Sequence, residues 1–296
     1  MRRALLVIGA LALIGAGAAW ALSAPERLPA AQLAGLSGDA EAGAYSFAAA
    51  GCANCHMAPD TVPGEAPALA GGQAFASPFG TFRAPNISSD PEAGIGTWTE
   101  AEIVQAMMRG VTPEGRHLYP AFPYASYAKG DLQTAFDIAA YLKTLPASAT
   151  PSQPHEVGFP FNIRRALGLW KRLYLTEAPV LTGELTAEVA RGRVLVETLA
   201  HCGECHTPRG PLGGTDTSRW LAGAPLPGGE GNVPNITPAA LTWSEDQIAE
   251  YLASGFTPEF DTAGGAMVEV IQSTSQLTPE DRLAIAAYLK AVPGVE

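Results

Sequence analysis

Two copies of one five-residue pattern, Cys-x-x-Cys-His, contain all four cysteines of this 296-residue chain. The copies lie at residues 52–56 and 202–206. In this pattern the two thiols add to the vinyl groups of a haem, and the following histidine coordinates its iron. The alternatives are a redox dithiol or structural disulfides, which need no such histidine, and a zinc site joining motifs 150 residues apart. The sequence therefore predicts two covalently bound haem c groups, held by Cys52, Cys55 and His56 in the first copy and by Cys202, Cys205 and His206 in the second.

A haem held by one histidine has a second axial position, which a methionine commonly fills in electron-transfer cytochromes. Met267 lies in a glycine-rich loop 61 residues after His206, and we predict that it ligates the second haem. The other methionines are the start residue, a neighbour of the first proximal histidine, and two residues at helical spacing for which core packing is expected: Met1, Met57, Met107 and Met108.

The first haem has no equivalent methionine, because the residue 145 positions before Met267 is Phe122. Either this haem is five-coordinate behind an aromatic side chain, or His117 ligates its iron through a neutral imidazole. The alternative for His117 is a hydrogen bond to a propionate, the backbone or water. His155 and His201 are expected to be solvated or structural.

The two motifs lie in two halves of the chain that repeat one another. Residues 84–88 (Ala-Pro-Asn-Ile-Ser) match 233–237 (Val-Pro-Asn-Ile-Thr), and residues 137–146 match 284–293. The repetition predicts two domains, 38–146 and 184–296, joined by a linker over 147–183.

Each half has the pattern of three helices placed around its motif, so we predict an all-α fold. Thr99 and Ser244 are suitable helix N-caps, and Gly110 and Gly255 are suitable stops. The expected helices are residues 40–50, 100–109 and 132–144 in the first half and 187–200, 245–254 and 279–291 in the second.

The N-terminus resembles an export signal. Residues 4–22 carry no charge and follow Arg2 and Arg3, which are expected to stay in the cytoplasm. At about 1.5 Å per residue, this segment nearly spans a hydrocarbon core of about 30 Å. We expect residues 1–24 to form a retained inner-membrane anchor, followed by a connection over 25–37, with the haem domains in the periplasm; cleavage near residues 21–24 is the alternative.

The overall charge is −11, with no long basic run, which disfavours a nucleic-acid partner. Residues 163–175 of the linker do combine four basic side chains with large apolar ones and are expected to form an amphipathic helix. This helix either rests on an anionic membrane surface or acidic partner, or packs across both haem domains.

Further motifs lie at residues 71–75, 79–82, 85–88, 115–121 and 201–209. They resemble those of the multihaem cytochrome c subunits of membrane-associated bacterial dehydrogenases for alcohols, gluconate, nicotinate or aldehydes. The resemblance implies that each half is a class I cytochrome c domain. It also implies that the protein takes electrons from a periplasmic dehydrogenase subunit and passes them to a downstream cytochrome or terminal oxidase. Unlike that family, this chain has no methionine at position 122 or near Gly130.

Together these features predict an electron-transfer subunit and not an enzyme. The alternative is a haem enzyme that acts on a small substrate, such as peroxide or a sulfur oxyanion, at an open first haem.

Overall fold

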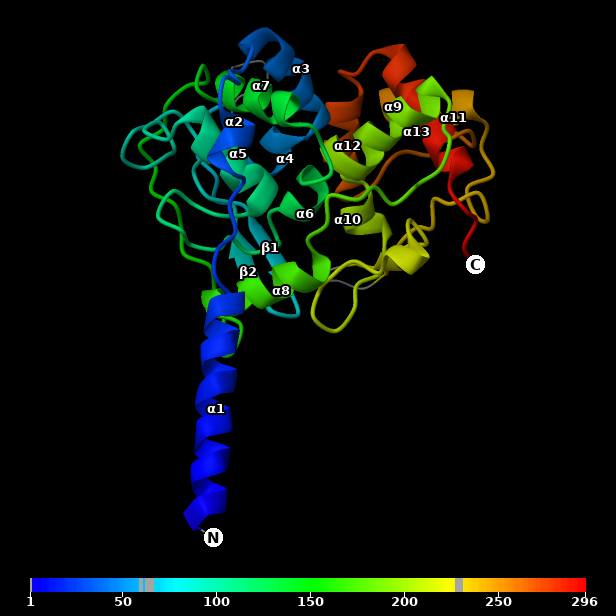
Figure 1. Ribbon diagram of the computed structural model, residues 1–296. Helices are drawn as coiled ribbons and strands as arrows, with labels where there is room; N and C mark the ends of the chain where they lie inside the picture. Colours follow the sequence, from blue (N-terminus) through cyan, green and yellow to red (C-terminus); the bar gives the residue numbers. More distant parts are fainter. Residues whose placement is uncertain (1, 59–60, 62–66, 227–230) are drawn as a thin grey trace.

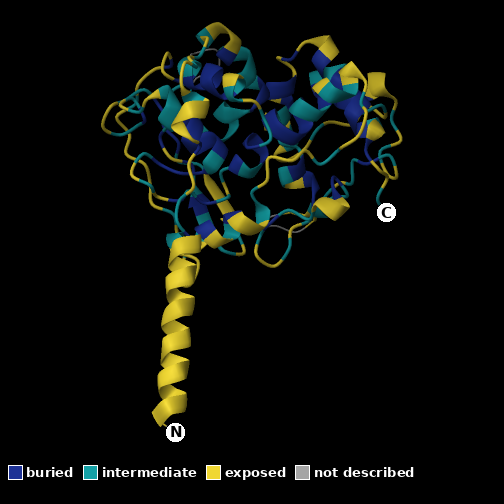
Figure 2. Ribbon diagram, in the orientation of Figure 1, coloured by how far each residue is buried: buried dark blue, intermediate teal, exposed yellow. Residues whose placement is uncertain are grey.

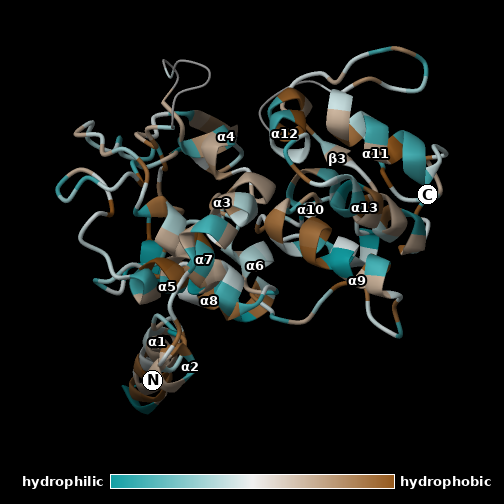
Figure 3. Cartoon of the chain, turned by 90° about the horizontal axis from the view of Figure 1, so that it is seen from above, coloured by the Kyte–Doolittle hydropathy of each residue, from teal (hydrophilic) through white to brown (hydrophobic). Residues whose placement is uncertain are grey.

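The computed structural model describes residues 2–58, 61, 67–226 and 231–296. Two helical bodies lie side by side, and one long helix, α1 (Arg2–Leu22), projects from the first of them (Figure 1). Figure 3, which views the molecule from above, shows the same two bodies in contact. Among the described residues, α1 is the one helix that is long and apolar enough to cross a membrane, and none of its residues is buried (Figure 2).

The same order of helices occurs in both bodies. The first contains α3 (Ala40–Ala49), α4 (Cys52–His56), α5 (Glu100–Arg109), α6 (Tyr124–Tyr127) and α7 (Leu132–Leu142). The second contains α9 (Ala187–Val194), η2 (Leu195–Leu199), α10 (Gly203–His206), α11 (Glu245–Ser254), α12 (Met267–Thr274) and α13 (Pro279–Ala291). Short helices α2 (Ala30–Leu33), η1 (Arg164–Ala166), α8 (Leu167–Tyr174) and η3 (Thr217–Arg219) lie in the connections.

The ends of the predicted helices are confirmed where local capping determines them. Thr99 caps α5 in a reciprocal pair of hydrogen bonds with Glu102, and Gly110 ends the helix in the left-handed conformation at φ 59°. Ser244 with Gln247 and Gly255 do the same for α11.

The structure also corrects the predicted elements in three places. The helix expected over 187–200 changes to a π-helical turn, η2, before the second motif, and the helix expected to reach residue 144 ends at Leu142. The expected all-α fold omitted two antiparallel ribbons, which form because each chain segment after a motif folds back on itself. These ribbons are β1 (Ala74–Ser77) with β2 (Gly80–Arg83), and β3 (Ala224–Pro225) with β4 (Asn232–Val233).

Glycines allow the first and last helices of each body to cross closely. A Cβ atom at Gly43 of α3 would lie 1.9 Å from the carbonyl oxygen of Asp137 on α7. A Cβ atom at Gly192 of α9 would lie 1.9 Å from the carbonyl oxygen of Ala284 on α13. Both helix crossings therefore require a residue without a side chain, and each lies in the core of its body.

We expect Gly192→Val to lower the free energy of unfolding by about 3 kcal/mol, because α9 and α13 must separate to admit the side chain. Urea unfolding of the full-length haem protein, followed by circular dichroism, measures the change. Ala187→Val, at an exposed position of the same helix, is the control and should cost well under half as much. Equal losses in the two variants would contradict this account of the crossing.

The linker contacts both bodies through Trp170 and Lys171, whereas Leu169 and Leu173 of the same helix stay exposed, so the packing alternative for the basic helix holds only in part. Trp170 of α8 donates a hydrogen bond from Nε1 to the carbonyl oxygen of Leu212 in the second body, at 2.9 Å. Lys171 is buried and donates from Nζ to the carbonyl oxygens of Arg109 and Gly110, at the end of α5. Burial lowers the pKa of Lys171 to about 7.

Candidate functional site

The four cysteines lie on or next to the short helices α4 and α10, and none of them forms a disulfide. Burial raises the pKa of Cys52 and Cys202 to about 12 each, and that of Cys55 to about 11. A redox-active dithiol needs a thiolate with a lowered pKa. These environments therefore disfavour a redox-active dithiol.

The histidine of each motif is held in place through one of its ring nitrogens. Nδ1 of His56 lies 2.9 Å from the carbonyl oxygen of Pro85, and Nδ1 of His206 lies 2.8 Å from that of Pro234. A carbonyl oxygen only accepts, so each Nδ1 carries the proton and each Nε2 has a free lone pair. Burial lowers the pKa of both histidines, which favours the neutral, ligating form. Within the described residues no hydrogen bond involves either Nε2, so both motifs fit a haem iron.

The prolines that orient the histidines belong to the repeated Pro-Asn-Ile segments. Asn86 anchors the first segment, since its Nδ2 donates to the carbonyl oxygen of Ser148, at 2.7 Å. Asn235 anchors the second through a 2.7 Å bond to the carbonyl oxygen of Val295. The sequence identified these segments as a repeat but did not predict that they orient the histidines. The signal for this role was their recurrence at the same place in both halves of the chain.

The two motifs meet at the interface between the bodies, through reciprocal contacts. Ser126 on α6 donates from Oγ to Oε1 of Glu204 in the second motif, at 2.8 Å. Ser273 on α12 donates from Oγ to Oδ1 of Asn54 in the first motif, at 3.2 Å. Each attachment helix is thus contacted by the other body, and α4, α6, α10 and α12 gather at the centre of the molecule (Figure 1).

Glu204 keeps its negative charge at this interface. Burial opposes its ionisation, yet the charge of Arg209 and the hydrogen bonds from Ser126 and Arg209 lower its pKa below the ordinary value. Arg209 forms an ion pair with the Glu204 carboxylate. The second motif therefore contains a partly exposed ion pair where the first has the neutral Asn54.

The candidate distal residues differ between the bodies. Met267 is partly buried and packs against the core. It is the first residue of α12, so it lies at the end of the expected loop and not within it. Phe122 is partly buried, with its ring centroid 5.7 Å from that of Tyr127. Iron ligation by Met267 stays a prediction.

His117 lies in a buried position at the base of α1, where its Nε2 donates to the carbonyl oxygen of Ser23 at 2.9 Å. This bond is the backbone alternative for His117, since Nε2 carries the proton; among the described residues Nδ1 is buried and has no hydrogen-bond partner. His155 and His201 are structural, as expected: Nδ1 of His155 accepts from the backbone of Arg83 at 3.1 Å, and Nδ1 of His201 bonds to the carbonyl oxygen of Leu199 at 2.7 Å.

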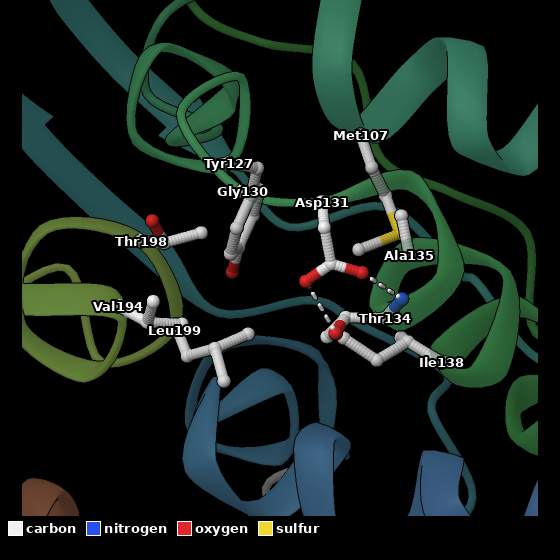
Figure 4. A pocket seen from close by; sticks show the side chains of 10 residues that line it. All are labelled: Met107, Tyr127, Gly130, Asp131, Thr134, Ala135, Ile138, Val194, Thr198 and Leu199. Carbon is white, nitrogen blue, oxygen red and sulfur yellow. Dashed lines mark hydrogen bonds between the residues drawn. The ribbon is translucent and has the colours of Figure 1, made fainter. Parts of the chain in front are cut away.

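Met107 and Met108 are buried, as predicted. Met107 lines a pocket between the two bodies, shown in Figure 4, together with Gly130 of the first and Thr198 of the second. A Cβ atom at Gly130 would lie 2.6 Å from Cγ2 of Thr198. Thr198 therefore occupies the space that a methionine side chain at position 130 would need.

Comparison with known proteins adds independent information. The family model described as Cytochrome c matches residues 189–293. The chain is 52% identical, over its whole length and that of the relative, to "Diheme cytochrome c-type" of Cereibacter sphaeroides. It is also 38% identical to the fructose dehydrogenase cytochrome subunit of Gluconobacter japonicus, over 85% of this chain and 52% of that protein. It is 37% identical to a nicotinate dehydrogenase subunit of Pseudomonas putida, over 86% of this chain and 21% of that protein. The chain thus spans about half or less of these two dehydrogenase subunits.

Proposed function

Because the chain belongs to the dihaem c-type cytochromes, with two covalently attached haem c groups, we propose that it relays single electrons from a partner dehydrogenase to the respiratory chain. Haem c, when bound, supplies a one-electron Fe(III)/Fe(II) couple. The subunits of fructose and nicotinate dehydrogenases among its relatives support a dehydrogenase as the electron donor. A downstream cytochrome or terminal oxidase is the proposed acceptor.

The observation that carries this proposal is the meeting of both attachment helices at one interface. Ser126 and Ser273 each reach across to the motif of the other body, at 2.8 Å and 3.2 Å. The same interface therefore fixes the two attachment sites relative to one another. An electron received at one site can reach the other without leaving the protein.

We further propose that residues 38–146 and 184–296 are two tandem class I cytochrome c domains and that Met267 is the distal ligand of the second haem. The shared helix caps, the paired glycine crossings and the paired proline carbonyls support the duplication. The exposed helix α1, which begins with Arg2 and Arg3, supports an inner-membrane anchor with the haem domains in the periplasm.

Isolation of the tagged full-length protein from its native membranes in mild detergent tests the function. A dehydrogenase subunit should co-purify, and addition of that subunit's substrate should reduce both haems. A protein that isolates without such a subunit and instead turns over peroxide or a sulfur oxyanion would overturn the proposal in favour of a haem enzyme.

Glu204→Gln should raise the reduction potential of the second haem, since a negative charge near the iron favours Fe(III) and Arg209 loses its partner. The amide oxygen still accepts from Ser126, so the interface is retained. Spectroelectrochemical titration measures the change, with Glu250→Gln on the exposed face of α11 as the control. An unchanged potential in Glu204→Gln, or an equal rise in the control, would count against this role.

A further inference from the structure

The C-terminal end of α1 is held by the linker. Arg165 stacks 4.2 Å above the ring of Trp20 and donates to the carbonyl oxygen of Trp20 at 2.8 Å. Arg172 donates from Nε to the carbonyl oxygen of Leu22 at 2.7 Å. These bonds satisfy carbonyl groups that the last turn of a helix leaves without intrahelical partners. The linker is therefore fixed at one end of α1 (Figure 1).

Large apolar side chains of this part of the linker remain exposed. On α8, Leu169 is 38% exposed and Leu173, one turn later, is 67% exposed. Their helical spacing places them on the same side as Arg165 and Arg172, whereas Lys171 is buried toward α5. Three further exposed apolar residues precede α8: Phe159 at 81%, Phe161 at 45% and Ile163 at 48%.

The length of α1 sets the depth of this surface. Its 21 residues extend for about 32 Å at about 1.5 Å each, which matches a hydrocarbon core of about 30 Å. If α1 spans the bilayer, Leu22 and Ser23 lie at the boundary between hydrocarbon and headgroups. Because Arg172 and Arg165 are bonded to this end of α1, α8 lies at the level of the lipid headgroups.

We propose that residues 159–173, here called the interfacial segment, form a second contact with the outer leaflet of the membrane. Phe159, Phe161 and Ile163, with Leu169 and Leu173, enter the boundary of the acyl chains, while Arg165 and Arg172, which are bonded to the end of α1, lie at the level of the lipid headgroups. The proposal rests on α1 being a membrane anchor. With two points of attachment, the haem-bearing bodies keep one orientation above the bilayer.

Photo-crosslinking of the full-length haem protein in vesicles of phosphatidylcholine and phosphatidylglycerol tests the contact. The photoreactive residue p-benzoylphenylalanine is introduced separately in place of Phe159, in place of Leu173, and in place of Phe260, which is 89% exposed in the second body. We expect phospholipid adducts, identified by mass spectrometry, at the first two positions and at least tenfold fewer at the third. Adduct yields at Phe159 and Leu173 no higher than at Phe260 would overturn the proposal.

A fourth position separates this proposal from the anchor on which it rests. The same photoreactive residue in place of Leu13, in the middle of α1, should give lipid adducts if the helix spans the bilayer. Adducts at Leu13 without adducts at Phe159 would leave the anchor intact and refute the interfacial segment. Absence of adducts at all positions would refute the anchor as well.

A second measurement uses substitution in place of crosslinking. Phe159→Ser combined with Leu173→Ser should remove most of the linear dichroism of the haem bands in oriented bilayers, because one attachment point alone permits tilting. Phe260→Ser should leave the dichroism unchanged. Unfolding curves of all variants, which should coincide, exclude a general loss of structure; dichroism equal to that of the wild type would contradict the second contact.

Discussion

Replacing Cys52 and Cys55 together by alanine is expected to leave a protein with one covalently bound haem in place of two. The thioether bonds are the covalent attachment, and the imidazole of His56 alone does not withstand denaturation. Extraction with acidified acetone, followed by quantification of haem in both phases, measures the loss. Cys52→Ala alone should retain the haem through Cys55, with an altered spectrum.

The effect should stay confined to the first body. Asn54 keeps its contact with Ser273, so the second motif should hold its haem with an unchanged spectrum. The matched pair Cys202→Ala and Cys205→Ala should give the converse result. Extraction of both haems from the unmodified protein would refute covalent attachment.

Met267→Ala is expected to abolish the near-infrared absorption of iron bonded to methionine sulfur and to lower the potential of one haem. A thioether ligand favours Fe(II), so its loss favours Fe(III). The other haem should be unaffected. Met107→Leu, a volume-conserving change at a buried position, is the control and should preserve the signal. Retention of the signal in Met267→Ala together with its loss in Met107→Leu would reassign the ligand.

The first haem should lack the methionine signal in the unmodified protein and should bind carbon monoxide or cyanide readily, because Phe122 cannot ligate iron and His117 is bonded to Ser23. Phe122→Met should then add a second methionine signal. Two such signals in the unmodified protein would contradict the register that pairs Phe122 with Met267.

Local sequence signals predicted the helices well and the contacts between them less well. The ends of α5 follow from Thr99, Glu102 and Gly110, all within a dozen residues of one another, so propensity and capping suffice. The bond from His56 to Pro85 joins residues 29 positions apart, and its existence depends on how the intervening chain folds back. The repeated segment indicated that Pro85 is significant, but it did not indicate that the carbonyl oxygen of Pro85 contacts His56.

His117 illustrates a second limit. Its position five residues before Phe122 suggested that both approach the same iron. The direction of a loop side chain, however, depends on what packs around it, and here Ser23 and the linker residue Arg164 engage the His117 side chain and carbonyl oxygen. The sequence showed that His117 lies near Phe122, but it did not show the direction of the His117 side chain.

The reciprocal serine contacts resemble those of an isologous interface, because each half contacts the motif of the other, as in a twofold symmetric homodimer. A true homodimer would have two identical sites, between which an electron has no preferred direction. Because both halves belong to one polypeptide, a substitution at one haem site leaves the sequence of the other site unchanged. Asn54 in the first motif corresponds to Glu204 in the second, and Phe122 corresponds to Met267. Such broken symmetry is what a difference in driving force, and hence one-way electron flow, requires.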